Sequence, residues 1–153
     1  MTLPSDYEIV VTRMFDAPRE LVFEASLRPE HVRRWWGPRH LTMTVCEADV
    51  RVGGAYRYVL RGPEGREAGF NGVYHEITPP ERIVCTQIFE PMPEHVAVVT
   101  VIFEDNDGRT KLTSTTRHAS KQARDGHLQS GMEAGMRDTF DRLEELLESL
   151  AKM

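Results

Sequence analysis

The sequence has little cysteine, and its two cysteines, Cys46 and Cys85, lie far apart in the chain. Two such residues cannot form the disulfide framework that holds many small secreted domains together. Each lies in an apolar segment rich in β-branched residues, where a cysteine behaves as a small buried hydrophobe. We therefore expect two reduced core cysteines and a cytoplasmic protein.

Long apolar runs and an excess of basic residues are also missing. No apolar stretch approaches the ~20 residues that a membrane-spanning helix needs. The opening segment MTLPSDYEIVV has no basic region followed by a long apolar run. A formal net charge of −5 argues against general nucleic-acid binding, which requires a basic surface. We expect neither a membrane nor a nucleic acid as partner.

Motifs for nucleotide, metal or nucleophile chemistry are absent as well. The sequence has no nucleophile elbow, no phosphate-binding loop and no dinucleotide fingerprint. Its six histidines are dispersed and do not have the spacing of metal ligands. We therefore expect no cofactor and no metal. Both a monomer and a homodimer stay open.

What the sequence does contain is typical of one globular domain covering residues 1–153. Hydrophobic residues make up 40% and charged residues 28% of the chain, an ordinary balance for such a domain. No internal repeat, low-complexity tract or linker divides the sequence. A chain of this length buries roughly two thirds of its unfolded surface, which is enough for a real core.

Seven β-branched or alternating segments predict strands. Short turns rich in glycine, proline and aspartate separate the last six, which is typical of an antiparallel meander. The predicted strands are Glu8–Phe15, Leu41–Val52, Ala55–Arg61, Gly69–Thr78, Arg82–Glu90, Val96–Glu104 and Thr110–His118.

Two short helices are predicted between the first and second strands. Asp16 as N-cap and Pro18 in the first turn predict the start of one helix. Pro29-Glu30 opens the other helix, which is predicted to end in Trp35-Trp36 before Gly37-Pro38. Adjacent helical residues point about 100° apart, so we expect one tryptophan in the core and Trp36 beside a cavity. The alternative is that both are structural.

A longer helix is predicted from about Ser120 to Leu150, where apolar residues recur three and four positions apart. Unbroken, it would be about 45 Å long. Gly131 and Gly135 lie one turn apart within it, and each costs about 1 kcal/mol in a helix interior. Together with the adaptable Met132 and Met136, they favour space for a ligand beside this helix.

Alternation along the strands places several polar side chains on the face turned toward this helix. Burying each of them without a partner would cost about 1–3 kcal/mol. The pattern therefore favours a sheet that lines a cavity, although bonds between these groups are an alternative. The polar groups are Gln87, Ser114, Thr116, His118 and the hydroxyls of Tyr56 and Tyr58.

The segment Thr12–Phe23 (TRMFDAPRELVF) resembles the opening of the heat-shock-protein-ninety ATPase activator homologues, single-domain members of the START-like (SRPBCC) superfamily. The match continues in family order through Pro29-Glu30-His31, Arg34–Pro38, Gly53-Gly54, Arg61-Gly62-Pro63, Pro79–Val84, Ser130–Glu133 and Asp141–Leu147. The resemblance implies an α+β helix-grip fold. A curved seven-stranded antiparallel sheet would wrap around a long C-terminal helix, with two short helices between strands 1 and 2 and an apolar cavity between sheet and helix.

Three functions follow from these expectations. The first is binding of a small hydrophobic or aromatic compound or lipid in the cavity. The second is catalysis in that cavity, as in the polyketide cyclases and aromatases of the superfamily, with His118, His75 or Tyr58 in proton transfer. The third is a stress-related role with a protein partner, which the family name suggests. Binding is favoured over catalysis because no pair of groups in the sequence is visibly arranged as acid and base. The predicted ligand-binding residues are Trp36, Tyr56, Tyr58, Cys85, Gln87, Val99, Ser114, Thr116, His118, Met132, Met136 and Phe140.

Overall fold

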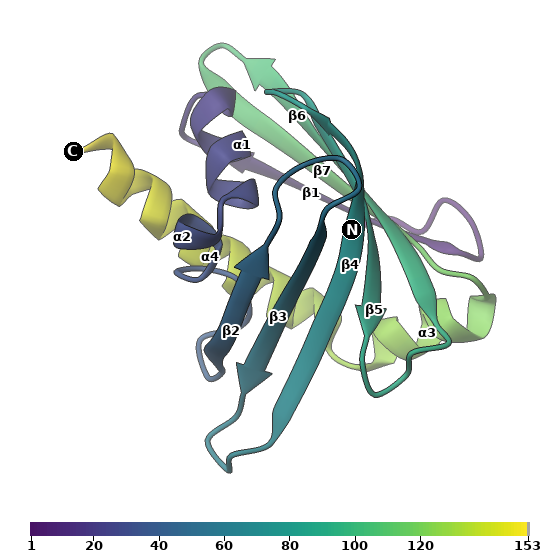
Figure 1. The fold of residues 1–153 in the computed structure, drawn as a ribbon. Helices are drawn as coiled ribbons and strands as arrows, with labels where there is room; N and C mark the ends of the chain where they lie inside the picture. Colours follow the sequence, from purple (N-terminus) through teal and green to yellow (C-terminus); the bar gives the residue numbers. More distant parts are fainter. Residues whose placement is uncertain (153) are drawn as a thin grey trace.

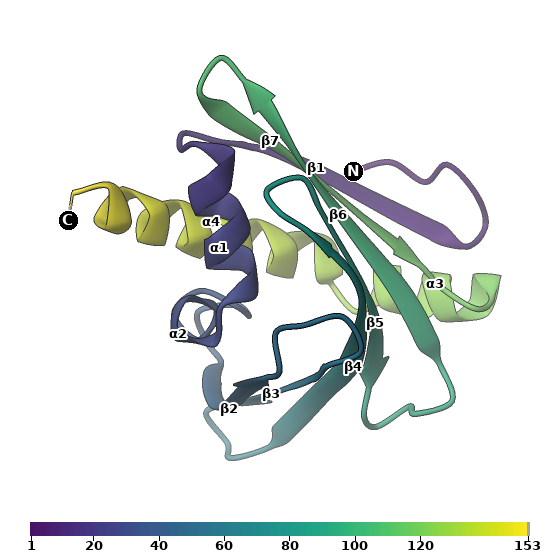
Figure 2. The same ribbon diagram turned by 45° about the horizontal axis from the view of Figure 1, so that its top comes forward.

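The computed structural model describes residues 1–152 and contains one seven-stranded sheet that curves around the C-terminal helical segment (Figures 1 and 2). Its strands are β1 (Glu8–Phe15), β2 (Thr42–Ala48), β3 (Ala55–Arg61), β4 (Glu67–Thr78), β5 (Arg82–Phe89), β6 (Val96–Asn106) and β7 (Arg109–Arg117). The strand order is β1-β7-β6-β5-β4-β3-β2. All neighbouring strands are antiparallel. The predicted α+β helix-grip fold is confirmed.

The strand boundaries depart from the predicted ones where glycine turns intervene. β2 ends at Ala48 and not at Val52, because the chain already turns before Gly53, which has a φ of 86° and donates its N–H to the Tyr74 carbonyl. β6 is longer than predicted, because Asp107 and Gly108 both have positive φ. These values suit a two-residue hairpin turn that keeps the strands paired up to their ends.

The two short helices both differ from their predicted limits. Helix α1 (Arg19–Leu27) has Pro18 as N-cap, so the prediction that Asp16 caps it was wrong. The Pro18 carbonyl accepts hydrogen bonds from the N–H groups of Leu21 and Val22, which form the first turn. The helix therefore begins only after the proline. Helix α2 (Pro29–Val32) ends before the tryptophans, which follow it in a turn.

The predicted long C-terminal helix is broken into α3 (Lys121–Gln129) and α4 (Met132–Ala151). Gly131 lies at the break with a φ of 83°, a left-handed conformation that glycine adopts without steric cost. The prediction that Gly131 lies inside a helix was therefore wrong. With 20 residues, α4 is about 30 Å long and not about 45 Å. Ser120 caps α3 by accepting from the Ala123 N–H at 3.0 Å.

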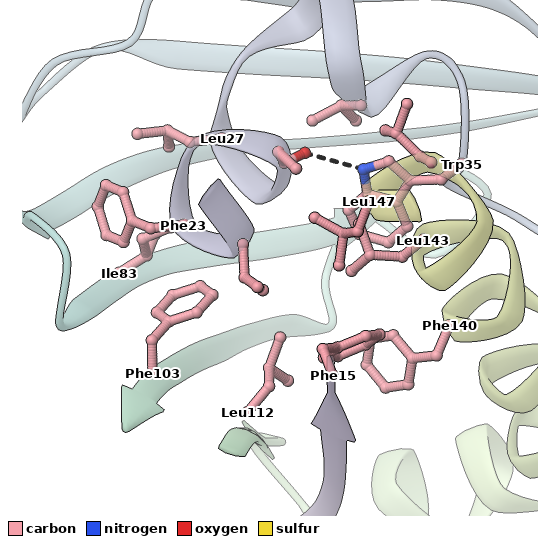
Figure 3. Close-up of a cluster of buried hydrophobic side chains, with 14 of the residues drawn as sticks. Phe15, Phe23, Leu27, Trp35, Ile83, Phe103, Leu112, Phe140, Leu143 and Leu147 are labelled. Atoms are coloured by element: carbon pink, nitrogen blue, oxygen red, sulfur yellow. Dashed lines mark hydrogen bonds between the residues drawn. The ribbon is translucent and has the colours of Figure 1, made fainter. Parts of the chain in front are cut away.

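The core is concentrated where α1 and α4 cover the sheet (Figure 3). Phe15 of β1 packs edge-on against Phe140 of α4, with ring centroids 5.7 Å apart. Phe23 of α1 packs in the same way on Phe103 of β6, at 5.3 Å. Edge-to-face pairs of this kind stabilise a core beyond the area they bury.

Trp35 anchors this core to the end of α1. Its side chain is 6% exposed, and its indole N–H donates to the Ala25 carbonyl at 2.8 Å, the dashed line in Figure 3. The Ala25 carbonyl would ordinarily accept the N–H four residues later, but that residue is Pro29, which has none. Trp35 therefore supplies the donor that the proline removes.

Burial on the inner face of the sheet decreases along three neighbouring strands. On β5, β6 and β7 the inner side chains of Ile83, Phe103 and Leu112 are at most 4% exposed. Toward the other end of the same strands, Ala97 is still buried, but most inner side chains are only half-buried, as at Val99 and Thr116. The core thus fills one end of the concave face and leaves the other end accessible.

Within residues 1–152, no helix has the length and hydropathy that a membrane crossing requires.

Candidate functional site

The accessible end of the concave face is formed by five half-buried side chains, which we call the inner-face patch. Cys85 and Gln87 come from β5, Val99 from β6, and Ser114 and Thr116 from β7. The strand register brings them together, because Cys85 pairs with Val99 and Val99 pairs with Thr116. All five are predicted ligand-binding residues.

Among residues 1–152, the side chains of Gln87, Ser114 and Thr116 in the inner-face patch have no hydrogen-bond partner. None of the side-chain hydrogen bonds among residues 1–152 involves Gln87, Ser114 or Thr116. In the same part of the chain, only the Glu144 Oε2 atom is both fully buried and without a partner. Solvent therefore still reaches the polar atoms of these three residues, and their hydrogen-bonding capacity is free for a ligand.

An aromatic wall adjoins the inner-face patch. Tyr74 of β4 pairs directly with Cys85. The ring centroid of Trp36 lies 5.0 Å from that of Tyr58 and 5.1 Å from that of Phe70. Trp36 is half-buried, in contrast to Trp35, so a flat ring of this wall remains partly accessible. We call Trp36, Tyr56, Tyr58, Phe70 and Tyr74 the aromatic wall.

Tyr56 can take its place in the aromatic wall because Gly72 has no side chain. Its hydroxyl donates to the Thr86 carbonyl at 2.6 Å. A Cβ atom added at Gly72 would lie 2.7 Å from the Tyr56 ring and would also collide with the Thr86 carbonyl. The absence of a side chain at Gly72 therefore lets the Tyr56 ring cross β4 and reach β5.

Burial keeps the ionisable groups of this region neutral at ordinary pH. It raises the pKa of Tyr74 to about 12 and the pKa of the Cys85 thiol to about 11. Burial also raises the pKa values of Tyr56 and Tyr58. A thiol that stays protonated is a poor nucleophile, so Cys85 is suited to apolar contact.

His118 follows β7 and lies against a second histidine that the sequence did not connect to it. Its Nε2 atom is 3.0 Å from Nδ1 of His127 in α3, and the two rings meet edge to face. Burial, His127, His95 and Arg124 together lower the pKa of His118 to about 4. Burial also lowers the pKa of His127. The pair is therefore neutral at pH 7 and ties α3 to the sheet.

This pair predicts a loss of stability in mild acid. Because the folded-state pKa of His118 lies below its ordinary 6.5, the unfolded chain binds more protons as pH falls from about 6.5 to 4. The free energy of unfolding is expected to drop by about 1 kcal/mol between pH 7.5 and 5, a value reduced for the solvent that reaches the ring. Urea unfolding at pH 7.5 and 5 measures the drop. The double variant His118→Gln/His127→Gln should lose most of it, and an equal drop in that variant would rule out this origin.

The remaining predicted site residues lie in three different surroundings. Met132 and Met136 of α4 are half-buried, and Met136 packs against the core. Phe140, Tyr56 and Tyr58 are between 5% and 6% exposed and belong to the core. His75 is exposed where β4 bulges between Tyr74 and Glu76, so it points away from the inner-face patch.

Sequence reasoning missed three residues of this region. Phe70 and Tyr74 alternate on β4 in phase with Gly72, a signal that was present in the sequence. His127 could not be found in this way, because its contact with His118 depends on how the chain reverses between β7 and α3.

Two hollows occur elsewhere in the described chain, and neither is the predicted cavity between sheet and helix. One, of about 520 Å³, lies on the outer face of β2–β4 and includes Arg57 and Glu90. The other, of about 280 Å³, lies beside α4 and includes Arg39, Arg142 and Glu145.

Arg57, Glu90 and Arg142 in these hollows are already engaged with protein groups. Arg57 holds Glu90 by two hydrogen bonds of 2.9 Å, and Arg57 and Asn71 lower the Glu90 pKa to about 2. Arg142 donates to the carbonyls of Gly37 and Arg34. The guanidinium groups of Arg57 and Arg142 already use donors on protein acceptors. The polar side chains of the inner-face patch are therefore better able to form hydrogen bonds with a ligand. Among residues 1–152, no three His, Cys, Asp or Glu side chains gather as metal ligands would.

Comparisons with known proteins agree with the fold. The family model described as "Activator of Hsp90 ATPase homolog 1-like protein" matches residues 16–148. A solved structure from Rhodobacter sphaeroides has 28% sequence identity and a TM-score of 0.90, with 97% of each chain covered. A structure from Staphylococcus epidermidis has 27% identity and a TM-score of 0.83, covering 96% of this chain and 93% of that one.

A structure from Nitrosomonas europaea, at 24% identity and a TM-score of 0.87, shows the same fold over 99% of this chain and 100% of that one. Among curated proteins, no sequence matches the chain. The family and the START-like fold support, in general terms, a ligand-binding or cochaperone-like module. Because the family model spans residues 16–148, the chain belongs to the family of Activator of Hsp90 ATPase homolog 1-like proteins.

Proposed function

We propose that the protein binds a small apolar or aromatic molecule between the inner-face patch and α4, without transforming it. This proposal rests on Gln87, Ser114 and Thr116. Their side chains are half-buried, accessible to solvent and without a hydrogen-bond partner among residues 1–152. Ligand sites typically combine apolar walls with a few polar groups of this kind.

Each part of the region has a role in this proposal. Val99 and the half-buried Trp36 contact the apolar body of the ligand. Met136 adapts to its shape, because an unbranched thioether side chain fits differing outlines. Gln87 and Thr116, from strands on either side of β6, orient its polar group.

A cyclase- or aromatase-like enzyme is the second candidate, and the His118–His127 pair is the observation in its favour. Two imidazoles in contact can pass a proton, which is the task of a general acid or base. A pKa of about 4 makes His118 a weak base at pH 7, so binding remains the function that the geometry supports better.

Titration with 2-naphthol tests the binding proposal. A ligand of about eleven heavy atoms, each contributing about 0.5 kcal/mol, is expected to bind with a Kd on the order of 0.1 mM. Trp36→Ala should weaken binding about tenfold, because it removes the accessible ring of the aromatic wall. Isothermal calorimetry measures both values, and circular dichroism checks that the variant is folded. Wild-type protein that shows no saturable binding to 2-naphthol and related neutral aromatics would end the proposal.

A further inference from the structure

On β3 to β7, the inner face of the sheet carries no charged side chain in the region that surrounds the inner-face patch. On β3 and β4 the inner positions are Tyr56, Tyr58, Phe70, Gly72 and Tyr74. On β5 and β6 they run from Ile83 to Phe89 and from Ala97 to Phe103, again without an acidic or basic residue. On β7, Leu112, Ser114 and Thr116 complete this uncharged surface.

The ionisable groups on this surface are held in their neutral forms. Burial raises the pKa values of the Tyr56, Tyr58 and Tyr74 phenols and of the Cys85 thiol, so none of them is charged at neutral pH. They provide hydrogen-bonding or apolar contacts and no counter-ion.

Two arginines at the margin of the inner-face patch are already paired. Arg124, which is 8% exposed and acts on His118, donates to the Ser5 carbonyl at 2.8 Å and lies 2.9 Å from the Asp125 carboxylate. Arg13, on the inner side of β1, lies 2.8 Å from the Asp141 carboxylate. Neither guanidinium is free to neutralise a ligand.

We infer, on the basis of the proposed function, that the ligand is a molecule without charge, with an aromatic or apolar body and a hydroxyl, carbonyl or amide group. A charge moved from water onto the inner-face patch loses hydration and gains no ion pair with Arg13 or Arg124, which is unfavourable. A neutral polar group loses less and recovers hydrogen bonds from Gln87, Ser114 and Thr116, which have both donors and acceptors.

A matched pair of probes tests this inference. 2-Naphthamide and 2-naphthoate share their ring system and nearly their shape, but only the naphthoate is charged at pH 7.5. Calorimetric titration of the wild-type protein is expected to show the amide binding at least about tenfold more tightly. Equal affinities, or tighter binding of the naphthoate, would overturn the inference while leaving the proposed function intact. Absence of binding by both probes and by 2-naphthol would overturn the proposed function, and the inference with it.

A charge introduced on the inner face should reverse this preference. Gln87→Lys places an ammonium group in the inner-face patch, and the ratio of amide to naphthoate affinity is expected to shift by at least about tenfold toward the naphthoate. Thr116→Lys provides the same test from β7 if the first variant does not fold. The control is Ile88→Lys, which adds the same charge to the next residue of β5 on the opposite face of the sheet. A similar shift in the control would contradict the assignment to the inner face.

Discussion

Replacing Trp35 with alanine is expected to lower the free energy of unfolding by about 3–5 kcal/mol, as when other large buried side chains are removed. The ring is 6% exposed and belongs to the core cluster. Its loss also leaves the Ala25 carbonyl without the indole donor at 2.8 Å, and Pro29 has no N–H to replace it. Two independent costs therefore fall on one substitution.

Urea unfolding followed by circular dichroism measures this loss, and the melting temperature should fall by roughly 6–20 °C. Trp36→Ala is the matched control, because Trp36 is the same residue type in the next position but is only half-buried. Its loss of stability should be clearly smaller. Comparable losses in the two variants, or a change below about 1 kcal/mol in Trp35→Ala, would show that Trp35 is not the anchor described here.

Filling the inner-face patch is expected to abolish ligand binding. Val99 lies between Cys85 and Thr116 in the strand register, so a tryptophan at this position would occupy the space proposed for the ligand. Val99→Trp should weaken the binding of 2-naphthol at least about a hundredfold, which corresponds to about 2.7 kcal/mol. Because Val99 is half-buried, the larger ring can project from the sheet and the fold should persist.

Thr100→Trp is the control for this variant, because Thr100 adjoins Val99 on β6 and points to the outer face. Calorimetry should show wild-type affinity in the control and no measurable binding in Val99→Trp. The reverse order of effects would move the binding site to the outer face of the sheet.

The strands could be predicted from the sequence because their alternation and turn residues are local signals. Glu8–Phe15 and Ala55–Arg61 have the predicted limits. The other strands differ from the prediction at their ends, where the conformation of the turn residues sets the limit. The break at Gly131 was missed because the apolar spacing continues from Leu128 through Met132 to Met136. Hydrophobic periodicity does not report the left-handed conformation of a single glycine.

The candidate site was predictable to a similar extent. Alternation places Gln87, Ser114 and Thr116 on one face, and the structure has them together on the inner side of the sheet. The amount of open space beside them is not a local property, since it depends on where α4 lies relative to the sheet. The contact between His118 and His127 likewise requires the tertiary arrangement of β7 and α3.

A crystal structure of the protein with 2-naphthamide tests the central claim most directly. The account predicts that the naphthalene ring lies against Val99 and Trp36, with the amide within hydrogen-bonding distance of Gln87, Ser114 or Thr116. A probe bound instead in the outer hollow beside Arg57 and Glu90, with the inner-face patch closed by side chains, would contradict it.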